Sequence, residues 1–492
     1  MQFRMEEISK NNQFGSLKQK AVSGAIWSGL QKFGLSIVSF LSNIVLARLL
    51  LPEDYGCIGM LSIFIVISNA LIYGGFVSAL IQKKDTTEKD YSTVFVWNFV
   101  IAIVLYIALF IGAPYISKFY GISKLSSVLR VQGVVLLLNG FSVIQTTILR
   151  KSLNFGKLAK INIASSVISV AIAIACAFFG WGVWALVTQQ ICISAINCIL
   201  LWSTTAWKPR IGFSKDSFLS LFSFGSFLLL NDLINSVCDN LQGFLIGKRF
   251  TPSVMGYYTQ AKKLEEVPTQ SISQMVAQVT FPIYAKIQDD QKRLYQAVKN
   301  TLKLMNFVNI PLMIVLIVTA LPLFTFVYSE KWIESVPYFQ ILCVAGLVNC
   351  FQSVNYQVVS ATGRSKELFL WNFVKRGTGI TLMLVGLMFG VKGLLWGMVG
   401  SFYVTYIVNA KLAYTSTSYS VFQQLRDNLP IFLLAVTAGL LSYTIGIFDV
   451  NYIALLAMQI VSFTIVYLGL AYLFKFQELK EIINIVKKIV KK

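Results

Sequence analysis

The sequence predicts an all-α polytopic membrane protein with about 14 transmembrane helices, arranged as two six-helix bundles in a parallel repeat plus two extra helices. Hydrophobic residues make up 56% of the 492 positions, and the mean hydropathy is +0.68. Apolar stretches of about 20 residues or more, enough to cross a bilayer, recur along the chain. These long blocks differ from the short alternating segments of a membrane β-barrel. Little of the chain is left for a soluble domain.

The predicted elements follow one another with short polar connections. Residues 1–20 form a polar cytoplasmic segment, and the apolar run after it contains Gln31 and Lys32. That run shows no small-residue cleavage site, so we expect a retained first span. The expected spans are residues 21–49, 55–82, 92–117, 127–149, 158–179, 183–204, 218–246, 253–285, 295–328, 335–361, 366–390, 393–413, 428–447 and 451–474. They group into an N-terminal bundle (21–205), a cytoplasmic linker (206–216), a C-terminal bundle (217–413), helices 13 and 14 (427–474) and a basic amphipathic tail (475–492).

The basic residues indicate the topology. Most of the 42 Lys and Arg residues fall in alternate loops and at the two ends of the chain. The positive-inside rule then places both termini in the cytoplasm. The net charge of +21 is mainly a topology signal, and nucleic-acid binding is not expected because the basic residues form no single soluble patch. The tail is expected to lie on anionic lipid headgroups at the inner surface.

Residue types exclude several kinds of chemistry. The chain has no histidine, and its seven cysteines form no Cys-x-x-Cys pair. No phosphate-binding Gly-x4-Gly-Lys-Ser/Thr loop is present. We therefore expect no enzymatic activity, no metal site and no cofactor.

The two halves of the chain resemble each other. Arg48, Pro52 and Gly56 follow the first span, and Lys248, Pro252 and Gly256 follow the seventh with the same spacing, 200 residues later. Further matches keep the same order with a slowly drifting offset, among them Pro114 with Pro322, Asn162 with Asn372, and Gly180 with Gly390. Six spans are an even number, so both copies enter the membrane from the same side. This predicts a parallel repeat, and transporters of that kind bind substrate between their halves.

The second half carries charges inside its spans that the first half lacks. The substrate-binding candidates are Lys262, Lys263, Lys375, Arg376 and Lys303 in the second half and Lys32 in the first half. The candidates for gating or ion coupling are Asp232, Asp239, Glu265 and Glu266. The first-half counterparts of the 262–266 cluster are Ser62, Ile63, Ile65 and Val66. Since a charge in hydrocarbon costs roughly 2.5–3.5 kcal/mol, such residues tend to line water-filled cavities.

Structural alternatives compete with these roles. Lys262 and Lys263 can pair locally with Glu265 and Glu266. Lys375 and Arg376 can extend to the inner surface from a shorter span that begins near Gly377. Lys303 can also be interfacial. Lys32 and Asp232 are 200 residues apart and are expected at one depth, where they could pair and close one end of a cavity.

Four segments resemble a known family. They are Leu17–Gly34, Leu46–Met60, Gly75–Asp85 and Asp90–Asn98. They resemble the polysaccharide transport branch of the multidrug/oligosaccharidyl-lipid/polysaccharide exporter superfamily, and most of all Wzx-type lipopolysaccharide and colanic-acid exporters. The resemblance implies a flippase in the bacterial cytoplasmic membrane that moves polyprenyl-pyrophosphate-linked oligosaccharide repeat units by alternating access. It also implies a monomeric transport unit, a coupling proton or sodium ion, and contact with a polysaccharide polymerase.

Two other classes compete with this reading. A cation-coupled multidrug antiporter of the same superfamily would have a cavity dominated by acidic residues, whereas basic residues outnumber acidic ones inside the spans here. A membrane-bound glycan polymerase or ligase would need a large outer loop, and the predicted outer loops are short.

Overall fold

The computed structural model describes the backbone of residues 2–209, 212–447 and 450–490, with side chains for all of these except 2–22, 25–26, 485–486 and 489–490. Contacts divide the chain into two compact units, unit 1 (Met1–Gly256) and unit 2 (Tyr257–Lys492). Every regular element among the described residues is helical. The predicted all-α class is therefore confirmed.

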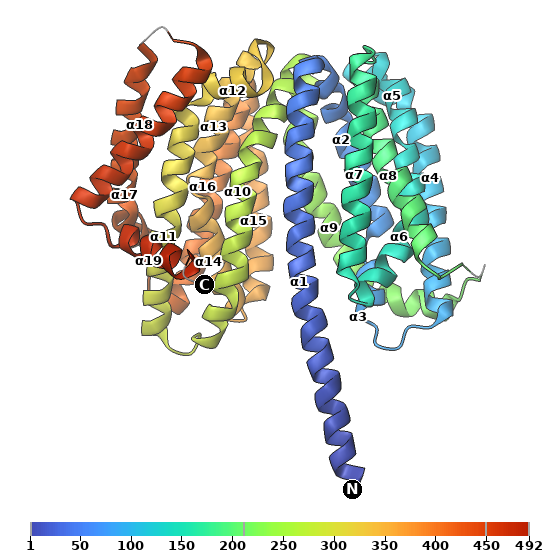
Figure 1. Ribbon diagram of the computed structural model, residues 1–492. Coiled ribbons are helices and arrows are strands. Elements are labelled where there is room, and N and C mark those ends of the chain that lie inside the picture. The colour runs from blue at the N-terminus through green and yellow to red at the C-terminus, as the bar shows by residue number, and fades with distance from the viewer. Residues whose placement is uncertain (1, 210–211, 448–449, 491–492) are drawn as a thin grey trace. The chain divides into compact units, whose positions relative to one another are not determined.

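Unit 1 is a bundle of long helices that run side by side, and α1 extends past the others at its N-terminal end (Figure 1). Its helices are α1 (Gln2–Leu49), α2 (Pro52–Tyr73), α3 (Phe76–Gln82), α4 (Glu88–Tyr120), α5 (Lys124–Gln132), α6 (Val134–Lys151), α7 (Phe155–Phe178), α8 (Val183–Thr204) and α9 (Lys215–Arg249). Its apolar core includes Phe76, Leu80, Val94, Phe95 and Ile144.

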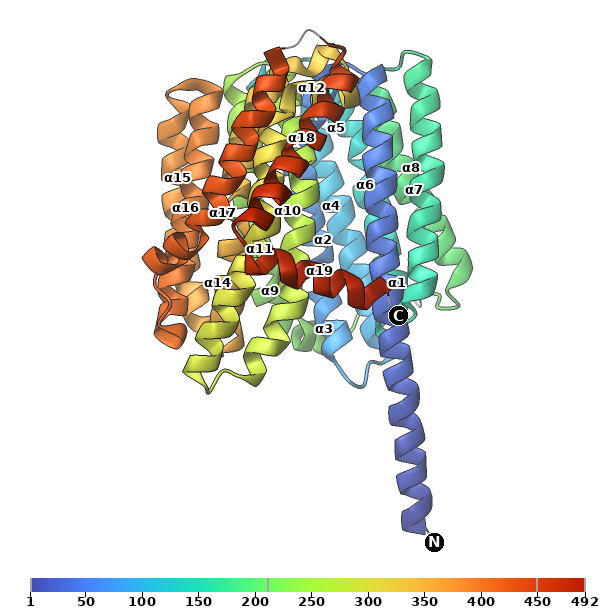
Figure 2. The ribbon, with the colours of Figure 1, turned by 60° about the vertical axis from the view of Figure 1, so that its left-hand side comes forward.

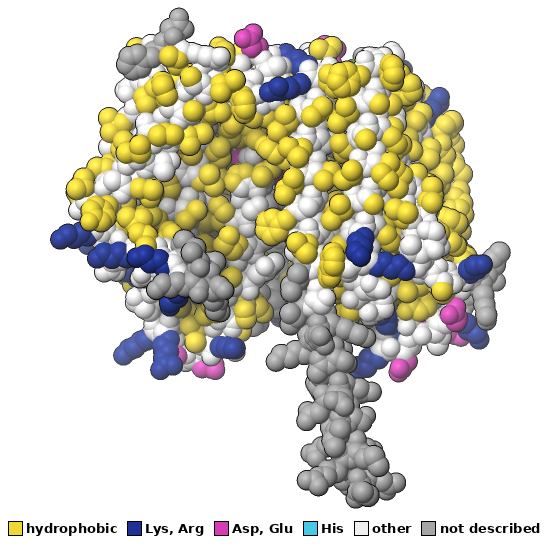
Figure 3. All heavy atoms as spheres, in the orientation of Figure 1, with side chains coloured by type: hydrophobic (Ala, Val, Ile, Leu, Met, Phe, Trp, Pro, Cys, Tyr) yellow, Lys and Arg dark blue, Asp and Glu magenta, His cyan; other side chains and the backbone are white. Residues whose placement is uncertain are grey.

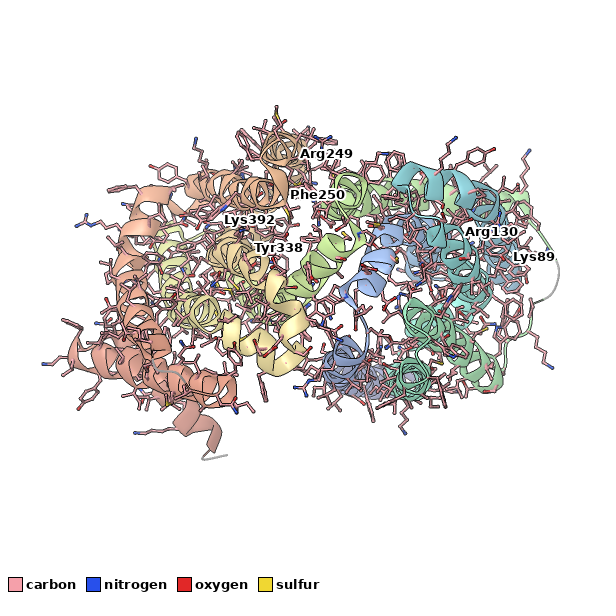
Figure 4. All side chains as sticks on the ribbon, turned by 90° about the horizontal axis from the view of Figure 1, so that it is seen from above. Lys89, Arg130, Arg249, Phe250, Tyr338 and Lys392 are labelled. Atoms are coloured by element: carbon pink, nitrogen blue, oxygen red, sulfur yellow. The ribbon has the colours of Figure 1, made fainter. Side chains whose placement is uncertain are left out.

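Unit 2 contains the remaining helices. They are α10 (Pro252–Lys286, which begins in unit 1), α11 (Gln291–Val318), α12 (Ala320–Tyr328), η1 (Glu330–Ser335), α13 (Val336–Gly346), α14 (Asn349–Ala361), α15 (Ser365–Leu387), α16 (Gly390–Thr417), α17 (Val421–Tyr443), η2 (Thr444–Ile447), α18 (Tyr452–Leu473) and α19 (Gln477–Val490). Figure 4 looks down the helices and shows Arg130 on α5 of unit 1, and Lys392 on α16 and Tyr338 on α13 of unit 2.

The helices coincide with the predicted spans, although five spans are each divided into two or more helices among the described residues. Within the described residues, 12 helical segments are long and apolar enough to cross a bilayer. The long helices α10 and α15 are not among them; α10 carries the 262–266 charges, and α15 carries the pair Lys375 and Arg376. The space-filling view shows apolar side chains over most of the helical surface and basic ones mainly near the helix ends (Figure 3).

The first division lies between α2 and α3, at a pair of glycines. Gly75 has φ of +62°, and an added Cβ there would overlap the backbone of Gly225 on α9. Glycine is required at Gly75 for both reasons, since only glycine adopts this conformation without cost and has no side chain to clash. The close approach also explains why α9 belongs to unit 1.

The segment after α3 is held by charged side chains. Lys151 at the end of α6 donates to the carbonyl oxygens of Leu80 and Lys83, at 2.9 and 2.6 Å. Lys83 pairs with the buried carboxylate of Asp90 at 2.8 Å, and Asp90 also caps α4 through the backbone N–H of Thr87. Two of the segments that resemble the exporter family, Gly75–Asp85 and Asp90–Asn98, therefore take part in the contacts that fix the loop between α3 and α4 against α6.

The duplicated Pro and Gly residues meet in unit 1. An added Cβ on Gly56 would overlap the carbonyl oxygen of Pro252, and one on Gly256 would overlap that of Pro52. This exchange is reciprocal, as expected when two copies of one motif are related by a two-fold axis. The first turns of α2 and α10 thus touch backbone to backbone.

The compact units and the predicted bundles have different boundaries. Contacts divide the chain after Gly256, whereas the sequence repeat places the boundary in the linker 206–216. The reason is that α9 packs on α2 and α3, with the Leu229 side chain against Gly74. The repeat is a similarity in sequence, whereas the compact units are defined by contacts between residues. The units therefore do not test the predicted bundle boundaries, which stay a prediction.

Candidate functional site

Helix α10 carries the 262–266 charge cluster well inside its length. Lys262 lies ten residues from Pro252, or about 15 Å along the helix axis. Its amine is 3.7 Å from the Glu266 carboxylate, so the predicted i,i+4 pair forms. Lys262 and Glu266 are half-exposed, and Lys263 is exposed. Basic side chains are therefore exposed about three turns inside α10, too far from its end to be residues of a membrane interface.

Glu265 points into the interior of unit 2. Its side chain is buried and accepts a hydrogen bond from the Thr269 hydroxyl at 2.5 Å. Its Oε1 atom lies close to Gly346 of α13, where an added Cβ would be 3.1 Å away. Asn309 of α11 donates to the Gly346 carbonyl oxygen at 3.0 Å, and Asn309 Oδ1 is buried with no hydrogen-bond partner among the described residues. The buried carboxylate of Glu265 thus lies where α10 packs on α13, beside a glycine whose carbonyl group is held by an amide of α11.

Hydrogen bonds continue from this point to α14. Asn349 donates to the Thr269 carbonyl oxygen at 3.0 Å and accepts from the Ser273 hydroxyl at 2.9 Å. Ser273 in turn lies 3.3 Å from the hydroxyl of Ser353. These contacts join α10 to α14 through polar groups, which are satisfied by each other because lipid offers no partner.

Lys375 lies at the far side of the same polar region. Its amine donates to Asn409 Oδ1 on α16 at 3.1 Å, and Asn409 donates to the Gln352 carbonyl oxygen on α14 at 3.4 Å. Lys375 is buried, and α15 is continuous from Ser365 to Leu387. The Lys375 amine therefore points to Asn409 and not to the surface, which favours an internal position over the alternative of a shorter span from Gly377. Arg376, the next residue, is half-exposed.

The other candidates make different contacts. Lys303 of α11 is 4.0 Å from the Glu478 carboxylate of α19, a placement that favours its interfacial alternative. In unit 1, Lys32 and Asp232 are both exposed, and the described residues include no ion pair between them. Asp239 is exposed on α9. Within unit 2, the structure therefore gives Glu265 and Lys375 amide neighbours, whereas Lys303 pairs with α19. Lys32, Asp232 and Asp239 belong to unit 1.

The amide residues were missed in the sequence. Asn309, Asn349 and Asn409 are uncharged, and the search for charges inside the spans passed over them. The repeat offered a signal, because Asn349 in the second half matches Asn139 in the first. The two residues also make corresponding bonds. Asn139 donates to Asn69 Oδ1 at 2.9 Å, and Asn349 donates to Thr269, which lies 200 residues after Asn69. An amide bridges the same pair of repeated helices in both halves, whereas the charges of the 262–266 cluster have no counterpart in the first half.

Solved structures share this fold. The lipid II flippase MurJ in an inward closed conformation superposes with a TM-score of 0.75 at 18% identity, over 92% of this chain and 98% of MurJ. An inward-facing multidrug resistance transporter of the MATE family superposes with a TM-score of 0.59 at 15% identity, over 82% of this chain and 96% of the transporter. At such identities the likeness concerns the fold alone.

Sequence relatives cover most of the chain. The teichuronic acid biosynthesis protein TuaB of Bacillus subtilis is 25% identical over 88% of this chain and 90% of its own length. The lipopolysaccharide biosynthesis protein WzxC of Escherichia coli is 24% identical over 81% of each chain. The family model described as "Polysaccharide biosynthesis protein" matches residues 45–337, more than half of the sequence. This multi-pass membrane protein therefore belongs to the polysaccharide biosynthesis protein family, in the exporter branch that its sequence resembles.

Proposed function

We propose that this protein is a flippase that moves a lipid-linked oligosaccharide with a phosphate-bearing head across the bacterial cytoplasmic membrane, for surface polysaccharide assembly. One combination carries the proposal: a member of the polysaccharide biosynthesis protein family holds accessible basic side chains deep within the helices of unit 2. Two relatives are named for teichuronic acid and lipopolysaccharide biosynthesis, and a third, from Rhizobium meliloti, is a succinoglycan biosynthesis transport protein.

The chemistry of such a substrate fits these residues. Sugars and a pyrophosphate are too polar to cross hydrocarbon unaided. Lys262, Lys263 and Arg376 offer positive charge to the phosphate oxygens, and charge-assisted hydrogen bonds are stronger than neutral ones. Lys375 is the neighbour of the half-exposed Arg376, and its buried amine donates to Asn409. It adds a second positive charge to that of the Arg376 guanidinium. The lipid tail stays in the bilayer during transfer.

Transfer proceeds by alternating access of the two halves of the repeat. The reciprocal contact of Gly56 and Gly256 with Pro252 and Pro52 closes the ends of α2 and α10 against each other. This contact follows the outer-end residues Arg48 and Lys248, given the orientation with both termini in the cytoplasm that the loop charges favour. Opening toward the outer leaflet then requires these two helix starts to separate.

Glu265 is the proposed site of ion coupling. An ionised carboxylate buried within a membrane bundle is costly unless a proton or a cation neutralises it. The Thr269 hydroxyl, the Gly346 carbonyl group and Asn309 Oδ1 are oxygen atoms of the kind that sodium also binds. Binding or release of one proton or sodium ion would change the charge beside Gly346, where α10, α11 and α13 meet.

The lysines are tested by the double substitution Lys262→Ala with Lys263→Ala. In cells, glycan export should fall, and lipid-linked repeat units should accumulate on the inner leaflet. The matched control is Lys286→Ala with Lys292→Ala, two exposed lysines near the loop between α10 and α11. Normal export by the Lys262/Lys263 variant at normal protein amount would remove these lysines from the mechanism.

Glu265→Gln tests the coupling separately. In proteoliposomes, a sodium or a pH gradient should accelerate lipid-linked glycan transfer by the unaltered protein, and the Gln variant should lose that acceleration. An unaltered response to both gradients would exclude Glu265. Gradient-driven movement of organic cations, with no transfer of lipid-linked glycan, would instead support the multidrug antiporter.

A further inference from the structure

The C-terminal helix α19 is set across the end of unit 2 by a sharp turn at Lys475. This residue has φ of +55°, and the turn is closed by bonds from the backbone N–H groups of Lys475 and Phe476 to Tyr472 and Ala471, at 3.1 and 3.0 Å. Such a left-handed residue is a common way to end a helix. Figure 2 shows that α19 runs crosswise to the long helices of unit 2.

One face of α19 is docked on unit 2. Phe476, Leu479 and Ile482 pack against a buried cluster from α11, α17 and α18 that includes Phe307 and Tyr467. The ring centroids of Phe476 and Phe307 are 6.0 Å apart. The ion pair between Glu478 and Lys303 adds a polar contact at this interface. The apolar stripe that the sequence shows is therefore partly used by the protein itself.

A second face of α19 stays uncovered and is basic. Ile483 is 42% exposed, and the exposed residues Lys480 and Lys487 lie three positions before it and four positions after it. Residues three and four apart share one helix face. The exposed Lys488 and the exposed Glu481 lie seven positions apart and border this face on the same side, so the lysines outnumber the one acidic residue there. In Figure 3, basic side chains gather over the region where Figure 1 places α19.

The position of α19 favours a lipid surface as the partner of this basic face. Tyr472, Leu473 and Phe474 at the end of α18 are 76%, 70% and 72% exposed. Large apolar side chains so exposed on a spanning helix face hydrocarbon, and α19 begins three residues later. The helix thus starts where the hydrocarbon ends, and long lysine side chains at that depth reach the headgroups while their methylene groups stay among the acyl chains.

We propose that Lys480, Ile483, Lys487 and Lys488 form a binding surface for anionic phospholipid headgroups of the membrane, with the lysines on the phosphates and Ile483 at the acyl boundary. A helix of this kind lies in the interface and gains affinity from both buried apolar area and attraction to anionic lipid. Each lysine near an anionic surface adds to this attraction. The surface is independent of the transported glycan.

The test is lipid binding by the full-length protein. Native mass spectrometry of the purified chain in detergent would follow titration with phosphatidylglycerol or with phosphatidylcholine. The triple variant Lys480→Gln/Lys487→Gln/Lys488→Gln should lose affinity for phosphatidylglycerol by roughly tenfold, with phosphatidylcholine unaffected. The same lysines changed to Arg should keep the preference, because the charge is kept.

A matched triple variant controls for net charge. Lys84→Gln/Lys89→Gln/Lys208→Gln removes three exposed lysines of unit 1, two from loops and Lys89 from the first turn of α4, and should leave the preference for phosphatidylglycerol intact. The proposal is overturned if the Gln variant of α19 keeps the full preference. It is also overturned if the control variant loses as much, or if the Arg variant loses the preference while eluting and melting like the unaltered protein.

Discussion

Gly56 at the start of α2 touches the carbonyl group of Pro252 at the start of α10, with no room for a side chain between them. Gly256 and Pro52 make the same contact in the opposite sense. The side chain of Ser253 donates to Glu53 at 3.3 Å beside them. Two copies of one short motif therefore meet at their helix starts, and the absence of two Cβ atoms permits the approach.

Adding a methyl group at this contact should be costly. We expect Gly56→Ala or Gly256→Ala to lower the stability of the detergent-solubilised protein by about 1–3 kcal/mol, as in other overpacked sites. Thermal unfolding measures the change. Gly112→Ala in α4 is the matched control, because no atom lies within 4 Å of the added Cβ, and it should be neutral or stabilising. Equal stability of all three variants would contradict the backbone contact.

The pair of Asn69 and Asn139 in unit 1 should show energetic coupling. Asn139→Ala leaves the Asn69 carbonyl oxygen without its donor between α2 and α6. Hydrogen bonds between membrane helices contribute about 0.6–2 kcal/mol. A double-mutant cycle with Asn69→Ala should give a coupling energy in this range, measured by chemical unfolding. Additive effects of the two substitutions would mean that the bond does not contribute.

Lys375 should matter for transport through its charge. Lys375→Met keeps the length of the side chain but removes the amine that Asn409 holds. Since a hydrogen bond to a charged group contributes about 1.5–3 kcal/mol, we expect glycan export to fall by about tenfold or more at equal protein amounts. Export assays with quantified membrane protein measure the effect. Wild-type export by this variant would assign Lys375 a packing role.

Lys303 should contribute little to transport. Its partner Glu478 is 4.0 Å away, and the Lys303 side chain is 31% exposed. Ion pairs of this kind contribute at most about 1 kcal/mol. Lys303→Met should leave export close to the unaltered level, and a cycle with Glu478→Gln should give a coupling energy of less than about 1 kcal/mol. A loss of export as large as that of Lys375→Met would return Lys303 to the substrate path.

Lys32 and Asp232 should approach each other during transport. They are separate and exposed in this structure, so a latch between them belongs to another state of the cycle. With the seven native cysteines replaced, Lys32→Cys with Asp232→Cys should form a disulfide that stops transport until it is reduced. Crosslinking and export before and after reductant measure this. Absence of a crosslink under turnover conditions would exclude the latch.

The helices could be predicted from the sequence because hydrocarbon imposes length and apolarity on every span. Even the helices α10 and α15, whose charges lower their hydropathy, agree with predicted spans, 253–285 and 366–390. The divisions within spans were not predicted. The break before Gly75 depends on the approach of Gly225, a contact between segments 150 residues apart.

The site was predicted only in part. Charges are conspicuous in apolar segments, so Glu265 and Lys375 stood out, but their amide neighbours did not. Glu265 and Thr269 of α10 lie against Gly346 of α13, whose carbonyl group is held by Asn309 of α11, and no spacing along the chain reveals that arrangement. Likewise, the charge of Lys303 was visible, whereas its partner on α19 was not.

The sequence by itself determined that this protein spans the membrane many times and carries a duplicated bundle. Both features can be recognised segment by segment, because the lipid requires each span to be long and apolar and the repeated residues keep their spacing along the chain. Its resemblance to an exporter family followed from the same residues. The tertiary structure alone decided which charges are buried, paired or accessible. That outcome depends on how side chains from distant helices satisfy each other where water is absent, and this is a property of packing in three dimensions.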